Sequence, residues 1–377
     1  MPSMLDSFKS HLPMLVVWTL FSTAAGCAGS KSATSPASAD MKTNTSPPPG
    51  ITSFSAPYPL VGSLESLDPR FNELVDGDAR IEKLAEGFHW SEGPLWVPSQ
   101  GFLLFTDVPE NIIYRWSPES AITTFMTSSG FHGEGPISPE PGANGLALDP
   151  AGRLLMCQHG DRRLGRLDDL QQPNGSQTSL ASHYQGKRFN SPNDLVVHRS
   201  GAVFLTDPPY GLPKRGEPEP AKELPYSGVF RVDVAGDVVL LHDGLERPNG
   251  IALSPDQNTL YVTNSHGPRP IVMAFDLTRD LNVSNGRVLF DATNLVARTG
   301  RKGGHDGLAI DEAGNIFTTG PGGVLVLSPR GEHLGTILTG EPTANCKFGD
   351  DGKTLYITSK MNLLRVRTKT RGAGFGL

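Results

Sequence analysis

Cysteine and positive charge are both scarce in this sequence. Three cysteines occur among 377 residues, and none is part of a C-x-x-C pair. Zinc fingers and disulfide-stapled small domains are therefore excluded, because both need closely spaced or paired cysteines. Lysine and arginine number 33 against 39 aspartates and glutamates, so the formal net charge is −6. A chain with this net negative charge lacks the basic surface that binds a nucleic-acid backbone, so we expect no nucleic-acid partner.

Long helical patterns and the motif of serine hydrolases are missing as well. Charged residues make up 19% of the chain, and the sequence carries too little alanine, glutamate, lysine and leucine for a coiled coil or a helical bundle. No G-x-S-x-G elbow occurs, so a serine nucleophile has no evident place. Glycine and proline, in contrast, are abundant, with 43 and 32 residues, one residue in five compared with about 12% in an average protein. This composition favours short strands joined by frequent turns.

The first 27 residues resemble an export signal. Lys9 precedes an apolar run, residues 12–21, which is too short to span a bilayer. The following segment, Ala24-Ala25-Gly26-Cys27, resembles the bacterial lipobox except that Ala24 stands where leucine is usual. We therefore expect residues 1–27 to be a signal peptide with a lipobox-like end, and the protein to be exported, either periplasmic or a membrane-anchored lipoprotein. Ordinary cleavage and a buried N-terminal helix are the alternatives.

The segment after Cys27 predicts a tether. Residues 28–75 form a Ser/Thr/Pro-rich tether and lead-in, and the part from Ala28 to about Pro59 has almost no large apolar residues, so we expect it to be disordered. A lipid on Cys27 would be the sole membrane contact that the sequence offers. The remaining domain is expected over residues 76–370.

A six-fold repeat runs through this domain. Each unit contains a polar residue, a small residue, alternating apolar residues, a turn signal and a second β-rich run. The spacings between the starts of successive units are 52, 49, 56, 57 and 39 residues, near the period of a four-stranded propeller blade. The polar residues that open the six units, here called the first-position residues, are Glu92, Asn144, Asn193, Asn249, Asp306 and Asn345.

The repeat predicts an all-β fold, a six-bladed β-propeller. Closing six blades into a ring removes exposed sheet edges, and further strand-like runs between the hairpins supply two outer strands for each blade. The first strand of each hairpin would then line the central channel. Two packed β-sandwich domains are the structural alternative, although a sandwich does not explain a polar residue that recurs at one hairpin position.

The first-position residues indicate a cation site. In a propeller they converge at one end of the channel, and every one of them carries a side-chain oxygen. Two carboxylates and several amides, with no cysteine or histidine, suit a hard divalent cation, with Ca²⁺ as the first choice. The alternative is that asparagine and aspartate merely begin strands after turns, where their side chains bind local backbone groups.

A second set of polar residues is expected at the same mouth. An antiparallel hairpin returns the end of its second strand to the start of its first. His159 could hydrogen-bond the substrate, carry a proton or simply pack, and Asp207 could contact the substrate or only shape the loop that follows it. His305, next to Asp306, is expected to turn away from the axis. The residues that end the second strands are Asp107, His159, Asp207 and Asn264.

Four motifs together resemble the gluconolactonase / senescence marker protein 30 / luciferin-regenerating-enzyme family. The resemblance covers roughly residues 80–365, and its bacterial gluconolactonase-type branch is favoured by residues 158–161 and 208–211. The family implies a six-bladed propeller with a divalent ion, commonly Ca²⁺, in the channel and the hydrolysis of a lactone. The motifs are Ser91-Glu92-Gly93-Pro94, Ser191-Pro192-Asn193-Asp194, Arg247-Pro248-Asn249-Gly250 and His305-Asp306-Gly307.

The resemblance also implies roles for single residues. The family's metal-binding residues and pocket asparagines match Glu92, Asn193, Asn249 and Asp306. Animal members carry a substrate-binding arginine where this chain has Ser191, so their substrate cannot be transferred. To the substrate we assign Asn144, His159, Asp194 and Asp207.

A mechanism follows from such a site. A divalent ion can polarise a lactone carbonyl, and a neighbouring carboxylate can accept the proton of an attacking water. We expect Asp306 to be this base as well as a ligand, with Glu92 as the anchoring ligand. The alternatives are a phosphotriesterase or another esterase on the same ion, a strictosidine-synthase-like lyase without metal, and a non-enzymatic binding propeller. The oligomeric state is not predicted.

Overall fold

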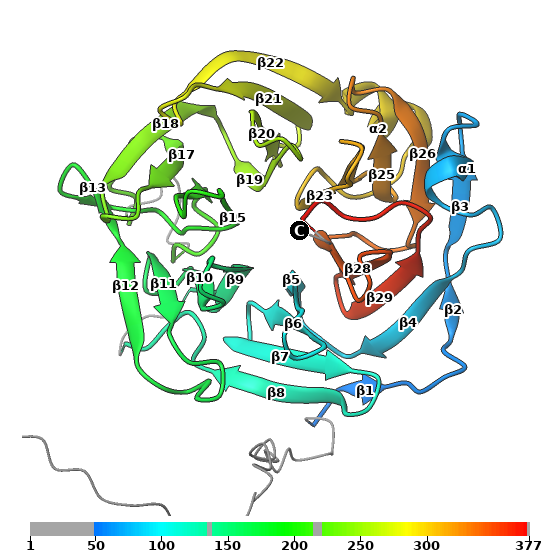
Figure 1. Cartoon of the computed structure of the whole chain (residues 1–377), viewed down its shortest axis with the longest axis horizontal. Coiled ribbons are helices and arrows are strands. Elements are labelled where there is room, and N and C mark those ends of the chain that lie inside the picture. Colours follow the sequence, from blue (N-terminus) through cyan, green and yellow to red (C-terminus); the bar gives the residue numbers. More distant parts are fainter. Residues whose placement is uncertain (1–48, 134–137, 214–220, 375–377) are drawn as a thin grey trace, which may run out of the picture. The chain divides into compact units, whose positions relative to one another are not determined.

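The predicted hairpins form six antiparallel sheets around a common axis (Figure 1). A computed structural model of the protein describes residues 49–133, 138–213 and 221–374. The expected signal peptide, Cys27 and most of the tether lie outside these residues. Within them, no helix is long and apolar enough to cross a membrane.

Each of the first four blades consists of four strands in chain order from the axis outward. The first blade contains β5 (Ser91–Val97), β6 (Phe102–Asp107), β7 (Ile112–Ser117) and β8 (Ala121–Thr127). The second contains β9 (Ala143–Leu148), β10 (Leu154–Gln158), β11 (Arg163–Leu167) and β12 (Gln177–Ala181). The third contains β15 (Leu195–Val197), β16 (Val203–Asp207), β17 (Ser227–Val232) and β18 (Val238–Leu245). The fourth contains β19 (Pro248–Leu253), β20 (Thr259–Asn264), β21 (Ile271–Leu277) and β22 (Val283–Asp291).

The last two blades take strands from both ends of the chain. The fifth contains β23 (Leu308–Ile310), β24 (Ile316–Gly320), β25 (Gly323–Leu327), β26 (His333–Leu338) and, added at its edge, β3 (Ser63–Ser66). The sixth contains β27 (Asn345–Gly349), β28 (Thr354–Ser359), β29 (Asn362–Arg367) and the N-terminal β4 (Ile81–Glu86), with which β1 (Thr52–Ser53) and β2 (Leu60–Val61) pair. The other elements are the hairpin β13 (His183–Tyr184) and β14 (Lys187–Arg188) and the helices α1 (Phe71–Leu74) and α2 (Thr293–Thr299).

The inner strands close a complete ring. Each contacts the next, from β5 through β9, β15, β19, β23 and β27 back to β5. In Figure 1 the inner strands surround the axis, and β8, β12 and β22 lie on the rim. The ring is held shut by antiparallel pairing of β4, which precedes the first blade, with β29, which ends the last. The predicted six-bladed β-propeller is thus confirmed.

The propeller includes residues that precede the predicted domain start at residue 76. Strand β3 pairs with β26, with Leu64 opposite Ile337. Phe71 is fully buried in the apolar cluster between the fifth and sixth blades. These residues were predicted to belong to the tether and lead-in, residues 28–75. They carry large apolar side chains, however, and burial of these side chains in the propeller is favourable.

The core is divided among the blades. In the described residues, buried apolar side chains form six clusters, each between two neighbouring blades. The cluster between the sixth and first blades contains Trp116 and Tyr356, whose ring centroids lie 5.7 Å apart. Trp96 stacks on Tyr356 at 5.8 Å. Because the apolar side chains pack between blades, polar side chains of the inner strands can gather at the axis.

Hydrogen bonds between neighbouring blades join the inner strands at the channel mouth. The amide of Gly250 donates to the carbonyl oxygen of Asp306 at 3.1 Å. Thr263 Oγ1 donates to the same carbonyl at 2.6 Å. One blade earlier, Thr206 Oγ1 donates to the carbonyl of Asn249, also at 2.6 Å. The backbone of each of these first-position residues is therefore fixed by the blade before it.

Glycine permits this close approach. A Cβ atom on Gly250 would lie 2.2 Å from the carbonyl oxygen of Asp306, and one on Gly307 would lie 1.9 Å from Oδ1 of Asn345. Neither contact is physically possible without a shift of the neighbouring blade. The small residue that follows most first-position residues is thus required by packing at the axis.

We predict that Gly250→Ala destabilises the propeller by about 1–3 kcal/mol or more, the usual cost of overpacking a site that cannot expand. Thermal denaturation followed by circular dichroism would measure the change. The matched control is Gly267→Ala, since a Cβ atom at Gly267 has nothing within 4 Å. Equal melting temperatures for the two variants would contradict the packing argument.

Candidate functional site

Electrostatic and hydrogen-bond contacts connect four first-position residues, namely Glu92, Asn249, Asp306 and Asn345. The six residues do not all stand at the same place relative to the start of the inner strand. Four of them belong to inner strands β5, β9, β19 and β27, whereas Asn193 and Asp306 precede β15 and β23 by two residues. The pairing of β5 with β6 and of β19 with β20 is also shifted beside the first position. At these points the inner strand no longer pairs regularly with the second strand of its hairpin. Its backbone hydrogen-bonds to the next blade instead, as the amide of Gly250 does to the carbonyl oxygen of Asp306. The side chains therefore face the axis from a locally irregular backbone.

Asp306 and Glu92 share a strongly acidic environment. Burial and the charge of Glu92, followed by that of Asp194, raise the pKa of Asp306 well above its usual range. Burial, and then the charges of Asp194 and Glu140, raise the pKa of Glu92 in the same way. A hydrogen bond from Asn249 favours the charged form of Asp306 but does not offset the repulsion. The charges of Glu92, Asp194 and Glu140 thus all act on the buried carboxyl of Asp306.

Asn193 is oriented by His159. His159 is completely buried, and burial lowers its pKa to about 4, so its ring is neutral. Its Nδ1 lies 3.3 Å from the carbonyl oxygen of Glu140, and its Nε2 lies 3.4 Å from Nδ2 of Asn193. With Nδ1 as donor to the carbonyl, Nε2 accepts from the Asn193 amide, which leaves Oδ1 of Asn193 directed elsewhere. These contacts make His159 a positioning residue for Asn193 rather than a solvent-facing group at the mouth.

Two buried oxygen atoms at the mouth have no hydrogen-bond donor among the described residues. They are Oδ1 of Asp306 and Oδ1 of Asn144. Asn345 differs, because its Oδ1 already accepts from the amide of Cys346 at 2.9 Å while its side chain hydrogen-bonds to Glu92 and Asp194. A buried oxygen without a partner costs free energy unless a cation or water binds it.

The donor set fits a hard divalent cation. No group of three or more His, Cys, Asp and Glu side chains in the described parts of the chain is arranged to hold a metal. The predicted set instead combines two carboxylates, Glu92 and Asp306, with amide oxygens of asparagine, which is the chemistry that Ca²⁺ accepts. The unpartnered Asp306 Oδ1 and the mutual repulsion of the acids are the features that a bound cation would relieve.

Asp194 and Asp207 are both buried, and Oδ1 of Asp207 has no hydrogen-bond partner among the described residues. Asp194 Oδ1 accepts from the Leu195 amide at 2.8 Å, and the charge of Lys347 lowers its pKa against the larger effect of burial, which raises it. Asp207 is fully buried, and its Oδ2 accepts from the amide of Asn190 at 2.7 Å. The contacts of Asp207 are those of a residue that holds a loop, so they give no support to its predicted role in substrate binding.

The same arrangement recurs at the end of two other second strands. Asp107 accepts from the amides of His89 and Trp90 at 2.9 and 3.0 Å. Asn264 Oδ1 accepts from the amide of Arg247 at 2.9 Å. These side chains fix the segment that leads into the first-position residue of their blade.

Three residues of the mouth were not predicted from the sequence. The negative charge of Glu140 contributes to the raised pKa values of Glu92 and Asp306. Tyr210 lies near Asp306, whose charge adds to the effect of burial in raising the Tyr210 pKa to about 12. The guanidinium carbon of Arg247 lies 5.6 Å from the centre of the Tyr210 ring. Glu140 and Tyr210 are in loops outside the repeat, which is why the pattern did not reveal them.

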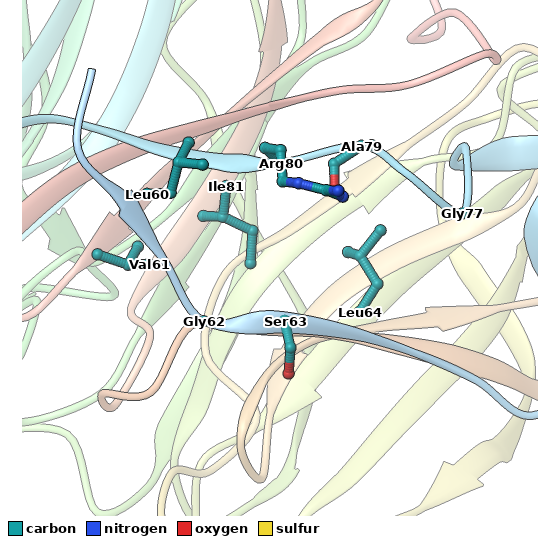
Figure 2. Close-up of a pocket in the computed structure, with 9 residues that line it drawn as sticks. All are labelled: Leu60, Val61, Gly62, Ser63, Leu64, Gly77, Ala79, Arg80 and Ile81. Carbon is teal, nitrogen blue, oxygen red and sulfur yellow. The ribbon is translucent and has the colours of Figure 1, made fainter. Parts of the chain in front are cut away.

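A separate groove of about 360 Å³ lies between β2, β3 and residues 77–81. Figure 2 shows Leu60, Val61 and Leu64 on one side of it and Arg80 and Ile81 on the other. None of the residues that line the groove carries a carboxylate or a side-chain amide. It therefore cannot supply the ligands of a hard cation, and the channel mouth remains the candidate site.

Comparison with known proteins identifies the family and relatives of this chain. Residues 90–361 match the family described as SMP-30/Gluconolactonase/LRE-like region. The gluconolactonase of Zymomonas mobilis is 40% identical over 318 residues, which are 83% of this chain and 88% of the relative. The structure of XC5397, a gluconolactonase from Xanthomonas campestris, superposes with a TM-score of 0.70 at 31% identity and covers 82% of this chain and 97% of that one. A calcium-binding protein, regucalcin from Agrobacterium tumefaciens, has the same fold, with a TM-score of 0.59 at 21% identity, covering 85% and 99%.

We predict that Asp207→Ala lowers the melting temperature and leaves kcat/KM of the folded protein within about threefold of wild type. The variant leaves a buried amide without an acceptor, at a cost of about 1–3 kcal/mol. Asp107→Ala is the matched control, because Asp107 accepts two backbone amides at the corresponding place in the first blade. An Asp207 variant that keeps its melting temperature and loses activity would restore the substrate-binding assignment.

Proposed function

The chain belongs to the SMP-30/gluconolactonase/LRE-like family and is a gluconolactonase-like lactone hydrolase, and we propose that it opens a sugar lactone with the aid of a divalent cation at the channel mouth. The observation that carries the proposal is the buried Oδ1 of Asp306, which has no hydrogen-bond donor in the described residues and faces other acids. The residues that would hold the cation are Glu92, Asn193, Asn249 and Asp306. Calcium is our first choice because all of these ligands are hard oxygen donors.

When bound, the cation supplies Lewis-acid polarisation of a carbonyl and a counter-charge for the oxyanion that forms. Asp306 accepts a proton from the water whose oxygen bonds to the lactone carbonyl carbon. The ring C–O bond then breaks, and the proton passes to the departing ring oxygen, which becomes a hydroxyl of the product acid. His159 contributes indirectly, because its Nε2 fixes the amide of Asn193. Asn144 and Asp194 are the residues that we propose to contact the substrate.

The calcium assignment rests on the chemistry of the donor atoms. The oxygen donors of this chain fit the ion, and a protein of the same fold is described as calcium-binding. At 21% identity that protein establishes the fold alone, so the choice of ion rests on the donor chemistry.

We also propose that the protein is exported and carries a lipid on Cys27. This proposal rests on the sequence alone, since residues 1–48 lie outside the described part of the chain. The basic Lys9, the apolar run and the small residues before Cys27 support it. Residues 28–48 would then connect the membrane surface to the propeller.

We predict that Asp306→Ala loses both the bound ion and lactone hydrolysis, whereas Asp306→Asn keeps an oxygen ligand but loses the base. For the asparagine variant we expect measurable calcium binding and a kcat lowered by roughly 100- to 10,000-fold. Calorimetric titration and a pH-stat lactone assay measure the two properties. The control is Asp276→Ala, because Asp276 pairs with Arg287 on β21 of the fourth blade, outside the inner strands. Full ion retention by Asp306→Ala would refute the ligand assignment.

For the export proposal, we predict that Cys27→Ser moves the protein from the membrane fraction to the soluble fraction, since the lipid would be its anchor. Cell fractionation followed by immunoblotting gives the readout, and Cys157→Ser, at a buried cysteine of the second blade, is the matched control. Wild-type protein found entirely in the soluble fraction would show that Cys27 is not lipidated.

A further inference from the structure

The loop that follows β16 is fixed against the mouth by Ser191. Ser191 Oγ donates to the carbonyl oxygen of Pro208 at 2.5 Å and accepts from the amide of Gly211 at 2.9 Å. A Cβ atom on Gly211 would lie 2.4 Å from Cβ of His159, so the loop packs directly on the residue that orients Asn193. Tyr210, between Pro208 and Gly211, is thereby held at the edge of the site.

Tyr210 is also tied to the neighbouring blades. Its hydroxyl is hydrogen-bonded to the side chain of Ser265, and Ser265 Oγ donates to the carbonyl oxygen of His305, the residue before Asp306. The Tyr210 side chain therefore extends from the third blade toward the start of β23. It remains partly exposed, unlike the fully buried His159.

Arg247 completes this side of the mouth. It stands two residues before Asn249, the same position relative to its first-position residue that Ser191 has in the third blade. Its backbone is fixed by Asn264 and by a bond from the Ser265 amide to its carbonyl oxygen at 2.9 Å. Its guanidinium lies over the Tyr210 ring at 5.6 Å, within the range of a cation–π contact.

We propose that Tyr210 and Arg247 bind the hydroxyl-bearing part of the lactone and so determine which lactones this enzyme accepts. The inference rests on the proposed function, because it assumes that the lactone carbonyl lies near Asp306. An aromatic face can pack against ring C–H groups, and a guanidinium can donate to several hydroxyls in a fixed geometry. Both groups are partly exposed and are held by backbone bonds, so they are preorganised for a polar ligand.

The test compares two six-membered lactones, glucono-1,5-lactone, which carries hydroxyls, and δ-valerolactone, which carries none. We expect Arg247→Gln to raise KM for glucono-1,5-lactone by roughly ten- to a hundred-fold, the effect of losing hydrogen bonds from a charged group. The kcat for this lactone and the kcat/KM for δ-valerolactone should stay within threefold of wild type. Tyr210→Phe keeps the aromatic face and should leave kcat/KM for both lactones within threefold of wild type, and Arg247→Lys should recover part of the loss.

A matched control and a binding readout complete the experiment. Arg115→Gln removes another arginine that lies over an aromatic ring, Phe102 at 5.0 Å, on the first blade, and should leave both lactones unaffected. Calorimetric binding of gluconate should weaken in Arg247→Gln, while calcium content and melting temperature stay at the wild-type values.

Equal losses on both lactones, or an unchanged KM for glucono-1,5-lactone, would overturn the role of Arg247 while leaving lactone hydrolysis intact. If the wild-type protein hydrolyses neither lactone, the proposed function fails and this inference fails with it.

Discussion

The hydrogen bonds that join neighbouring inner strands at the axis are the constraint on which the rest of the molecule depends. Gly250 N donates to the carbonyl of Asp306 at 3.1 Å, a separation that leaves no room for a Cβ atom. Ring closure by β4 and β29 holds six blades at this spacing. As a result, side chains from six separate segments converge on one small volume, and each has a backbone fixed by the neighbouring blade. Such a site is rigid before any ligand arrives.

The acidic residues of the propeller divide into two groups by their contacts. Asp107 and Asp207 accept backbone amides and hold the segments that lead into the inner strands. Glu92 and Asp306 instead face one another across the mouth, where burial and repulsion disfavour their charged forms. The first group stabilises the architecture, and the second group is at a disadvantage unless a cation binds. We propose that a cation bound at the mouth relieves this unfavourable charge and so links the fold to hydrolysis.

The repeat in the sequence was sufficient to predict the propeller and the first-position ring, because the alternation of apolar residues and the turn signals depend on local chain geometry. It did not predict that β4 would complete the sixth blade, since residues 81–86 have no repeat partner nearby in sequence. Strand geometry predicts where Asp207 stands but not which amide its carboxylate accepts, so its role in substrate binding stays a prediction. Tyr210 and Glu140 lie in irregular loops that the repeat does not cover. A role for Arg247 in the site could be inferred only from its contact with the Tyr210 ring in the structure.

The most direct test of this account is calcium reconstitution of lactone hydrolysis. The wild-type protein would be stripped with a chelator, passed through a desalting column and titrated with Ca²⁺ while bound ion and glucono-1,5-lactone hydrolysis are measured together. The account predicts negligible hydrolysis in the stripped protein and a rate that rises in proportion to bound ion, up to about one per chain. Full hydrolysis by metal-free protein would contradict it.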